Sequence, residues 1–353
     1  MTRTVPVRVV EVHTSSGFDW GDAAIGAAAV LALAAIAFGL KGAGMFTLRS
    51  VVVALVAAAF FAPSAHALDF SPWGTAVNAE SVLGTSSELN DPAAQDGCPI
   101  QSPDGTSLYM ASTRLGGHGG IDIWVAHRDS KDAPWGAPEN LPAPINSASD
   151  DFCPTPIRGG GLFFVSRRTT PGVTCGMGDI YLTRLNPGTG WEDPQHLGCE
   201  ENGGPNTGRD EQGPSYLKTG GPTLYFSSGP DIYSSERHGN GRFGPPEPVT
   251  ELNSSLMDIQ PNVRHDGREI VFASNRGGPT AFGGQDLWAA TRKSVNGAWS
   301  APVNIGTVQN QINTAANETR PSLSWDGTTL YFGRAPGLPP TSDIFVATRE
   351  KND

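Results

Sequence analysis

Basic residues are few in this chain of 353 residues. There are 24 Lys and Arg against 35 Asp and Glu, which gives a formal net charge of −11 at pH 7. Surfaces that bind nucleic acid are rich in Lys and Arg, because the phosphate backbone attracts positive charge. The composition therefore argues against nucleic acid as a partner.

Cysteine is also scarce, and two common catalytic motifs are missing. The four cysteines form no C-x-x-C pair, which argues against a zinc ribbon or a thioredoxin-like site. No H-E-x-x-H or G-x-S-x-G segment occurs, and His118 has no second histidine at metal-ligand spacing. Metal-hydrolase and serine-hydrolase chemistry therefore have no support in the sequence.

Long apolar runs occur only near the N-terminus. Residues 45–67 combine a basic residue, the run VVVALVAAAFFA and the small-residue segment AHA, a pattern typical of a signal peptide cleaved before Leu68. Residues 23–40 are apolar enough for a marginal membrane helix. Two interpretations of residues 1–44 stay open: an upstream extension ahead of a true start at Met45, or a membrane anchor.

Export would place the mature chain, residues 68–353, in a secreted or periplasmic, extracytoplasmic location. Disulfides form in such oxidising compartments, and all four cysteines lie in this part of the sequence. Contact with a membrane is expected only if residues 23–40 are retained.

The mature part repeats one pattern five times. DIWVAHR at Asp122 returns as DIYLTR at Asp179, DIYSSER at Asp231, DLWAATR at Asp286 and DIFVATR at Asp343. Each copy follows a second apolar run, which itself follows a proline and a turn such as PDG or GGG. Apolar runs divided by Asp-Gly or Gly-Gly predict β-hairpins. Each copy therefore predicts three strands, named a, b and c in chain order.

A fourth strand, d, is marked by an aromatic residue that usually precedes a proline. It follows strand c at Trp135, Trp191, Phe243 and Trp299, whereas the fifth copy has none, and a similar segment stands ahead of the first copy at Trp73. We therefore predict an all-β fold, a five-bladed β-propeller of four-stranded antiparallel blades. Its N-terminal strand, residues 72–79, completes the last blade and covers that blade's edge. The repeats span residues 96–141, 151–197, 211–249, 258–305 and 318–349.

One family resemblance rests on the first copy. The segment from Pro99 to Trp124 reads P-x-x-S-P-D-G-x-x-L-Y and then S-x-R-x-G-G-x-G-x-x-D-I-W, and it resembles the WD40-like PD40 repeats of TolB-like β-propellers. Copies one, four and five keep the Asp-Gly turn, and copies two and three have Gly-Gly instead. The resemblance implies an extracytoplasmic binding or scaffold module, which we expect to be a monomer that binds a protein or a carbohydrate. Propellers of this family commonly have six blades, so a specific TolB role is not implied.

The cysteines occupy related positions in these repeats. Cys98 and Cys153 each directly precede the strand-a proline in adjacent blades, and Cys175 and Cys199 share one blade and one face. Because inner strands converge near the propeller axis, their Cα atoms approach the separation that a disulfide requires. We predict the pairs Cys98–Cys153 and Cys175–Cys199.

A second signature precedes each strand a. It reads Asn-Ser/Thr, three residues, an acid, two residues and Pro, and blade one departs from it with Asp91 in the asparagine position. The acids are Asp96, Asp151, Glu211, Asp258 and Glu318. Because they share one offset from the innermost strand, we expect them to ring one mouth of the central channel.

Three interpretations of these acids stay open. Each acid caps its own turn by accepting backbone amides, or the five converge to bind calcium or a polyhydroxylated ligand. In the third, two of them act as the carboxylate pair of a glycoside hydrolase, an alternative that rests on fold-level analogy.

Arginines follow strand b on the same face. They are Arg114, Arg168 and Arg276; blade three has Gly229 there, and blade five is two residues shorter. Either they pair with the aspartates that open strand c, or they hold a ligand carboxylate. Those aspartates are Asp122, Asp179 and Asp286.

The glycine-rich segment GGHGG, residues 116–120, connects strands b and c of the first copy. A phosphate-binding loop needs a helix after it, whereas a predicted strand follows here. A structural connection is therefore expected.

Overall fold

The structure is a computed structural model that describes residues 69–278, 280–335 and 341–352. The expected signal peptide at residues 45–67 and the segment 1–44 lie outside the described residues. Among the residues described, no helix is long and apolar enough to cross a membrane.

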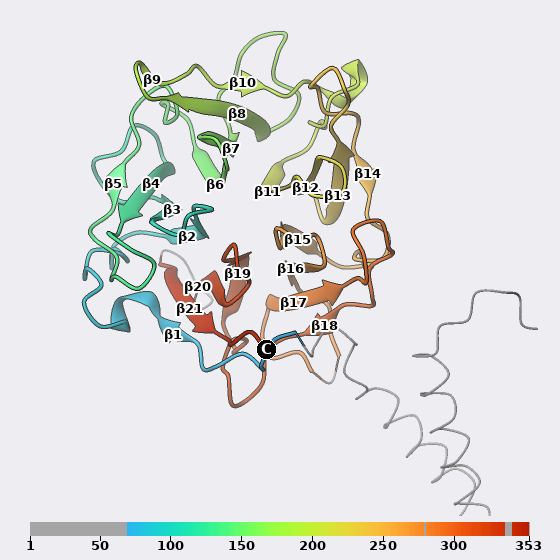
Figure 1. Ribbon diagram of the computed structural model, residues 1–353. Coiled ribbons are helices and arrows are strands. Elements are labelled where there is room, and N and C mark those ends of the chain that lie inside the picture. The colour runs from blue at the N-terminus through green and yellow to red at the C-terminus, as the bar shows by residue number, and fades with distance from the viewer. Residues whose placement is uncertain (1–68, 279, 336–340, 353) are drawn as a thin grey trace, which may run out of the picture. The chain divides into compact units, whose positions relative to one another are not determined.

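Five antiparallel sheets form the blades of a propeller (Figure 1). Blade one contains β2 (Asp96–Gln101), β3 (Ser107–Ser112), β4 (Asp122–His127) and β5 (Glu139–Asn140). Blade two contains β6 (Asp151–Ile157), β7 (Gly161–Ser166), β8 (Asp179–Asn186), β9 (Gly190–Trp191) and β10 (Gln195–His196). Blade three contains β11 (Glu211–Leu217), β12 (Thr223–Ser228), β13 (Asp231–Glu236) and β14 (Glu247–Pro248). Blade four contains β15 (Asp258–Val263), β16 (Glu269–Ser274), β17 (Asp286–Thr291) and β18 (Val303–Asn304).

Blade five is completed from the other end of the described chain. It contains β19 (Asn317–Leu323), β20 (Thr329–Ala335), β21 (Asp343–Thr348) and β1 (Val77–Asn78), and β1 pairs antiparallel with β21. Two 3-10 turns, η1 (Ala79–Ser81) and η2 (Glu200–Asn202), lie in connections. The predicted closure by the N-terminal strand is therefore confirmed, although the regular ladder is two residues long.

The core lies between neighbouring blades. In every strand b the first and third apolar positions have no exposed surface, because both faces of each sheet are covered by adjacent sheets. The third positions are Met110, Phe164, Phe226, Phe272 and Phe332. One buried cluster, for example, joins Trp124 of blade one to Tyr331 of blade five.

Both disulfides have the predicted pairing. Cys98 joins Cys153 across blades one and two, with Cα atoms 4.9 Å apart. Cys175 joins Cys199 within blade two, with Cα atoms 5.5 Å apart. Two disulfides are typical of a protein that folds in an oxidising compartment.

Candidate functional site

One face of the propeller carries the d–a and b–c connections. The first residue of strand a, the last regular residue of strand b and the first residue of strand c stand in one row, as Asp96, Ser112 and Asp122 do in blade one. We call this side the d–a/b–c face. Every site residue predicted from the repeated signatures lies at this end of a blade.

The five signature acids are fully buried at this end. None of their side chains has exposed surface, so they present no open carboxylate to solvent. In blade two, the Asp151 carboxylate accepts the backbone N–H of Ser147 at 2.6 Å and its hydroxyl at 2.7 Å. Asp258 has the same contacts with Ser254. The turn before strand a therefore closes over the acid, as in the interpretation that each acid caps its own turn.

The arginines pair with these acids, and not with the strand-c aspartates. Three of the pairs have N–O distances of 2.6–2.8 Å, and the fourth, Arg276 with Asp258, is also in direct contact. The pairs are Arg114–Asp96, Arg168–Asp151, Arg276–Asp258 and Arg334–Glu318. The prediction that the arginines pair with the strand-c aspartates was therefore wrong, because those aspartates accept backbone N–H groups instead.

Blade five does have an arginine, from a different position. Arg334 lies directly opposite Glu318 in the strand pairing, where the other blades have serine. In blades one, two and four the arginine follows that serine by two residues, as Arg114 follows Ser112. A search at the fixed offset therefore missed Arg334.

Each paired guanidinium also covers an aromatic ring of its blade. Arg114 lies 5.3 Å from the centroid of Trp124, and Arg276 lies 5.2 Å from that of Trp288. The strand-c aromatic rings of these four blades are thereby covered by arginine.

The signature asparagine joins strand c of one blade to the start of the next. Asn146 accepts the backbone N–H of Ile123 at 2.9 Å and donates to its carbonyl oxygen at 2.9 Å. In blade one this residue is Asn90, which makes the same two contacts with Ile344. The assignment of Asp91 to the asparagine position was wrong, because that copy has one additional residue before its acid.

The strand-c aspartates organise the glycine-rich connections. Asp122 accepts the backbone N–H groups of His118 at 2.8 Å and Gly119 at 3.1 Å. A Cβ on Gly119 would stand 2.1 Å from the Ser149 carbonyl oxygen, so only glycine fits against the neighbouring connection. The segment GGHGG is therefore a structural connection, and the imidazole of His118 is exposed.

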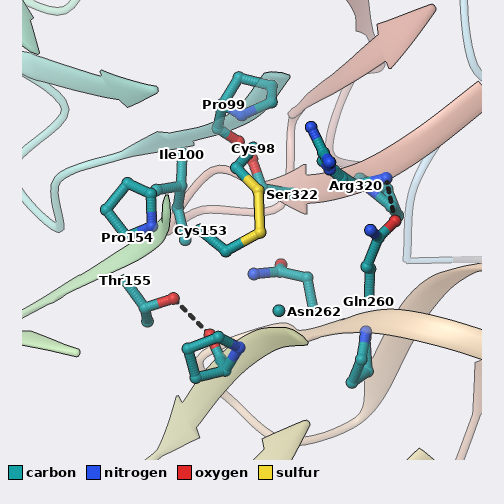
Figure 2. A pocket seen from close by; sticks show the side chains of 14 residues that line it. Cys98, Pro99, Ile100, Cys153, Pro154, Thr155, Gln260, Asn262, Arg320 and Ser322 are labelled. Atoms are coloured by element: carbon teal, nitrogen blue, oxygen red, sulfur yellow. Dashed lines mark hydrogen bonds between the residues drawn. A yellow bond between two sulfur atoms is a disulfide. The ribbon is translucent and has the colours of Figure 1, made fainter. Parts of the chain in front are cut away.

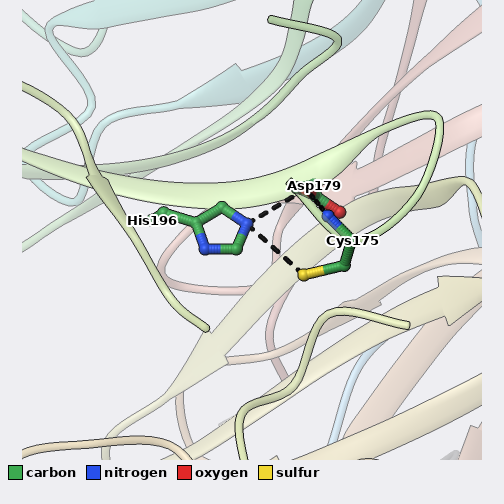
Figure 3. Close-up of side chains that lie close together, drawn as sticks. All are labelled: Cys175, Asp179 and His196. Atoms are coloured by element: carbon green, nitrogen blue, oxygen red, sulfur yellow. Dashed lines mark hydrogen bonds and ion pairs between the residues drawn. The ribbon is translucent and has the colours of Figure 1, made fainter. Parts of the chain in front are cut away.

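In the described part of the chain the signature acids do not come together as a cluster of three or more potential metal ligands. One group of three potential metal ligands is found among the described residues: Cys175, Asp179 and His196 (Figure 3). Their potential ligand atoms all lie within 4.8 Å of one another. His196 Nε2 lies 3.0 Å from Asp179 Oδ2. The Cys175 sulfur is bonded to Cys199, so it is not a thiolate ligand in this state.

Glu211 of blade three is the exception among the acids. It is fully buried, Pro230 stands where an arginine stands in blades one, two and four, and Oε2 has no hydrogen-bond partner in the described chain. Burial raises the pKa of Glu211 from 4.5 to about 7, although the Thr207 hydroxyl donates to its Oε1 at 2.5 Å. Burial also raises the pKa of Glu318, and Arg334 opposes that shift.

This shift predicts a pH dependence of stability. Between pH 4.5 and pH 7 folded Glu211 keeps a proton that the unfolded chain has lost, so stability falls as pH rises through this range. The loss amounts to about 3 kcal/mol. Glu211→Gln has no such proton, so its free energy of unfolding relative to wild type should rise by that amount between pH 4.5 and pH 8. Urea unfolding at both values measures it; a difference that does not change with pH would contradict the shift.

More than half of the large exposed apolar side chains of the described chain lie on the d–a/b–c face. Seven of the twelve large apolar side chains that are exposed in the described chain lie in b–c connections or in the d–a connections after β14 and β18. They are Leu115, Val173, Met177, Leu256, Met257, Phe282 and Val308. Leu115 is 97% exposed and Met177 68%. Single residues in irregular loops carry no periodic pattern, so the repeat analysis did not identify them.

The central channel is narrow at its waist. A cavity of about 30 Å³ lies among the five strands a, lined by 14 residues from all five blades (Figure 2). That volume holds one or two particles the size of water. A sugar ring does not fit.

No family model and no curated protein matches this sequence. Among solved structures, a xylan β-1,4-xylosidase from Bacillus halodurans C-125 is similar at 15% identity and a TM-score of 0.48, over 73% of this chain and 54% of that one. TolB from Acinetobacter baumannii is similar at 14% identity and a TM-score of 0.41, over 77% of this chain and 55% of that one. An α-L-arabinofuranosidase from Lactobacillus brevis is similar at 15% identity and a TM-score of 0.47, over 76% of this chain and 95% of that one. This chain spans about half the length of the first two, and their activities are stated of those proteins alone.

Proposed function

We propose that the protein is a binding or scaffold module that recognises a protein ligand on its d–a/b–c face and catalyses no reaction. The observation that carries the proposal is the concentration of exposed apolar side chains in the loops of that face. Clustered exposed apolar groups mark surfaces that bind other proteins. A rigid propeller positions such loops with little loss of conformational entropy on binding.

The chemistry of these side chains favours a protein over a glycan. Six of the seven are aliphatic or Met, and Phe282 is the one aromatic residue. Sugar-binding sites need aromatic faces together with polar groups, whereas the strand-c rings lie under arginines. A glycan remains the alternative ligand.

A glycoside hydrolase is the alternative activity. It needs two carboxyl groups about 5–10 Å apart that reach a bound sugar. The five signature acids have no exposed surface, and four of them are held by arginine. Glu211 has the raised pKa of a general acid, yet it is equally buried. The five signature acids, as described, therefore do not supply such a pair.

The proposal includes three further assignments: family, location and oligomeric state. We assign the chain to the TolB-like propellers with PD40 repeats, in an extracytoplasmic location, as a monomer. It needs no cofactor, and calcium binds none of the acids, because they are already neutralised or hydrogen-bonded within their blades. It contacts a membrane only if residues 23–40 are retained.

Site-specific photo-cross-linking in the producing cells tests the proposed face. A photoreactive amino acid replaces Met177 or Phe282 on the d–a/b–c face. Matched controls replace Leu185 or Val303, which are similarly exposed but lie in or near strands c and d at the far ends from that face. We expect a discrete cross-linked protein at positions 177 and 282 and none at the controls.

Two results would contradict the proposal. Equal cross-linking from both sets of positions would remove the assignment to one face. Cross-linking at neither set, together with release of reducing sugar from a glycan panel, would favour the hydrolase.

A further inference from the structure

The waist of the channel is built by a repeated backbone feature. In each strand a, the second residue after the acid has a positive φ between 47° and 57° and precedes a proline, and the ladder shifts register there. These residues are Cys98, Cys153, Gly213, Gln260 and Arg320. All five line the same cavity (Figure 2), so the feature turns one residue of each blade toward the axis.

The chemistry of this ring is asymmetric. Cys98 and Cys153 form a disulfide, Gly213 has no side chain, Gln260 is neutral and Arg320 is a cation. None of the 14 lining residues is acidic. The cavity thus has a positive group and no carboxylate to balance it.

Arg320 has no partner for its guanidinium within the residues that the structure describes. Its Nε is buried without a hydrogen bond, and its backbone N–H donates to Gln260 Oε1 at 3.1 Å. Burial lowers the pKa of Arg320, and the nearby charge of Arg167 adds to that effect. The four arginines of the acid–arginine pairs, by contrast, each have a carboxylate.

The Arg320 side chain packs against a glycine of the neighbouring blade. A Cβ on Gly97 of blade one would stand 2.6 Å from Arg320 Nη1, so the absence of a side chain at Gly97 leaves room for the guanidinium. The residue as a whole is partly exposed, but its Nε is buried without a partner, and a charge withdrawn from water is costly unless an anion compensates it. Asn262, on the wall of the same cavity, accepts the Leu323 N–H with Oδ1 and keeps its amide N–H groups as further donors.

We propose that the channel waist binds one small monovalent anion, of the size of chloride, at the Arg320 guanidinium. The cavity volume of about 30 Å³ corresponds to one or two particles the size of water, which suits chloride better than the larger sulfate, phosphate or carboxylate ions. The anion is a structural component of the channel and is independent of the ligand that the d–a/b–c face binds.

Anomalous diffraction from crystals grown in bromide tests the location. We expect one strong bromide peak in contact with the Arg320 guanidinium, because bromide replaces chloride with little change in size. Peaks on the outer surface alone would mean an adventitious ion only and would overturn the proposal.

Thermal unfolding in different sodium salts at one ionic strength tests the binding itself. Chloride or bromide should raise the wild-type melting temperature by about 3 °C relative to gluconate, since a ligand that binds only the folded state stabilises it. Sulfate, which is larger, should lack the anion-specific increment that chloride and bromide share.

Two variants separate the channel from general salt effects. Arg320→Gln should lose the difference between chloride and gluconate, whereas Arg242→Gln, which removes an equal charge from an exposed position, should keep it. If Arg320→Gln does not fold, Arg320→Lys is the second variant. It keeps the charge but changes its position, so the rise in melting temperature in chloride relative to gluconate should be smaller than in wild type. An unchanged increment in the Arg320 variant that folds would contradict the proposal.

Discussion

Deletion of residues 68–80 is expected to lower the free energy of unfolding by about 5 kcal/mol or more, which approaches the whole stability of an ordinary domain. The segment supplies β1, which pairs with β21 and covers the edge of blade five. It also supplies Phe70, which lies under the guanidinium of Arg349 at 4.0 Å from the ring centroid. Arg349 in turn pairs with Glu269 of blade four.

Urea unfolding of chains that begin at Leu68 and at residue 81 measures this effect. The shorter chain exposes an unpaired strand edge, so it should also aggregate at lower concentration. If it is too insoluble to measure, Phe70→Ala provides a graded variant, with an expected loss of about 3 kcal/mol. Equal stability of the two chains would contradict closure by the N-terminal strand.

Asp258→Asn is expected to lower the free energy of unfolding by about 3–5 kcal/mol, because it leaves Arg276 buried without its counter-charge. The carboxylate is fully buried, and the arginine side chain is 15% exposed. The substitution also weakens the two hydrogen bonds from Ser254. Glu251→Gln, an exposed acid in the preceding connection, is the matched control and should change stability by less than about 0.5 kcal/mol.

The effect of calcium on the melting temperature distinguishes acids paired with arginine from acids that bind a cation. Because Arg276 already neutralises Asp258, millimolar calcium should leave the melting temperature of wild type and of Asp258→Asn unchanged. A rise in wild type that Asp258→Asn abolishes would show that the acids do bind the cation.

The architecture was predictable because each blade repeats the same local pattern. Asp-Gly and Gly-Gly turns between apolar runs specified strands a, b and c, and the displaced segment at Trp73 specified the closure. The pairing of Cys98 with Cys153 followed from their equivalent positions in adjacent inner strands. These features depend on local sequence and on one topological rule, the closure of the ring.

The contacts of the repeated polar residues were not predictable to the same degree. Repetition located the five acids, but the direction of a side chain at the start of strand a depends on the turn that folds over it. Arg334 occupies another strand position than Arg114 and still reaches the acid of its blade. Asn90 was missed because one additional residue shifts the signature.

Arg320 shows a different limit of sequence patterns. The equivalent residues of the five blades share a backbone conformation and a position in the channel, but have no common side-chain chemistry. A pattern search compares residue types, so it passes over such a position. Only the structure brings these five residues together.

A double-mutant cycle on Asp258 and Arg276 tests most directly whether the repeated acids and arginines hold the blades together rather than bind a ligand. The free energies of unfolding of wild type, Asp258→Asn, Arg276→Gln and the double variant are measured without calcium or any other added ligand. We predict a coupling energy of about 2 kcal/mol, so that the double variant is more stable than the sum of the single losses implies. Losses that add to within about 0.5 kcal/mol would contradict the account, because the two side chains would then act independently.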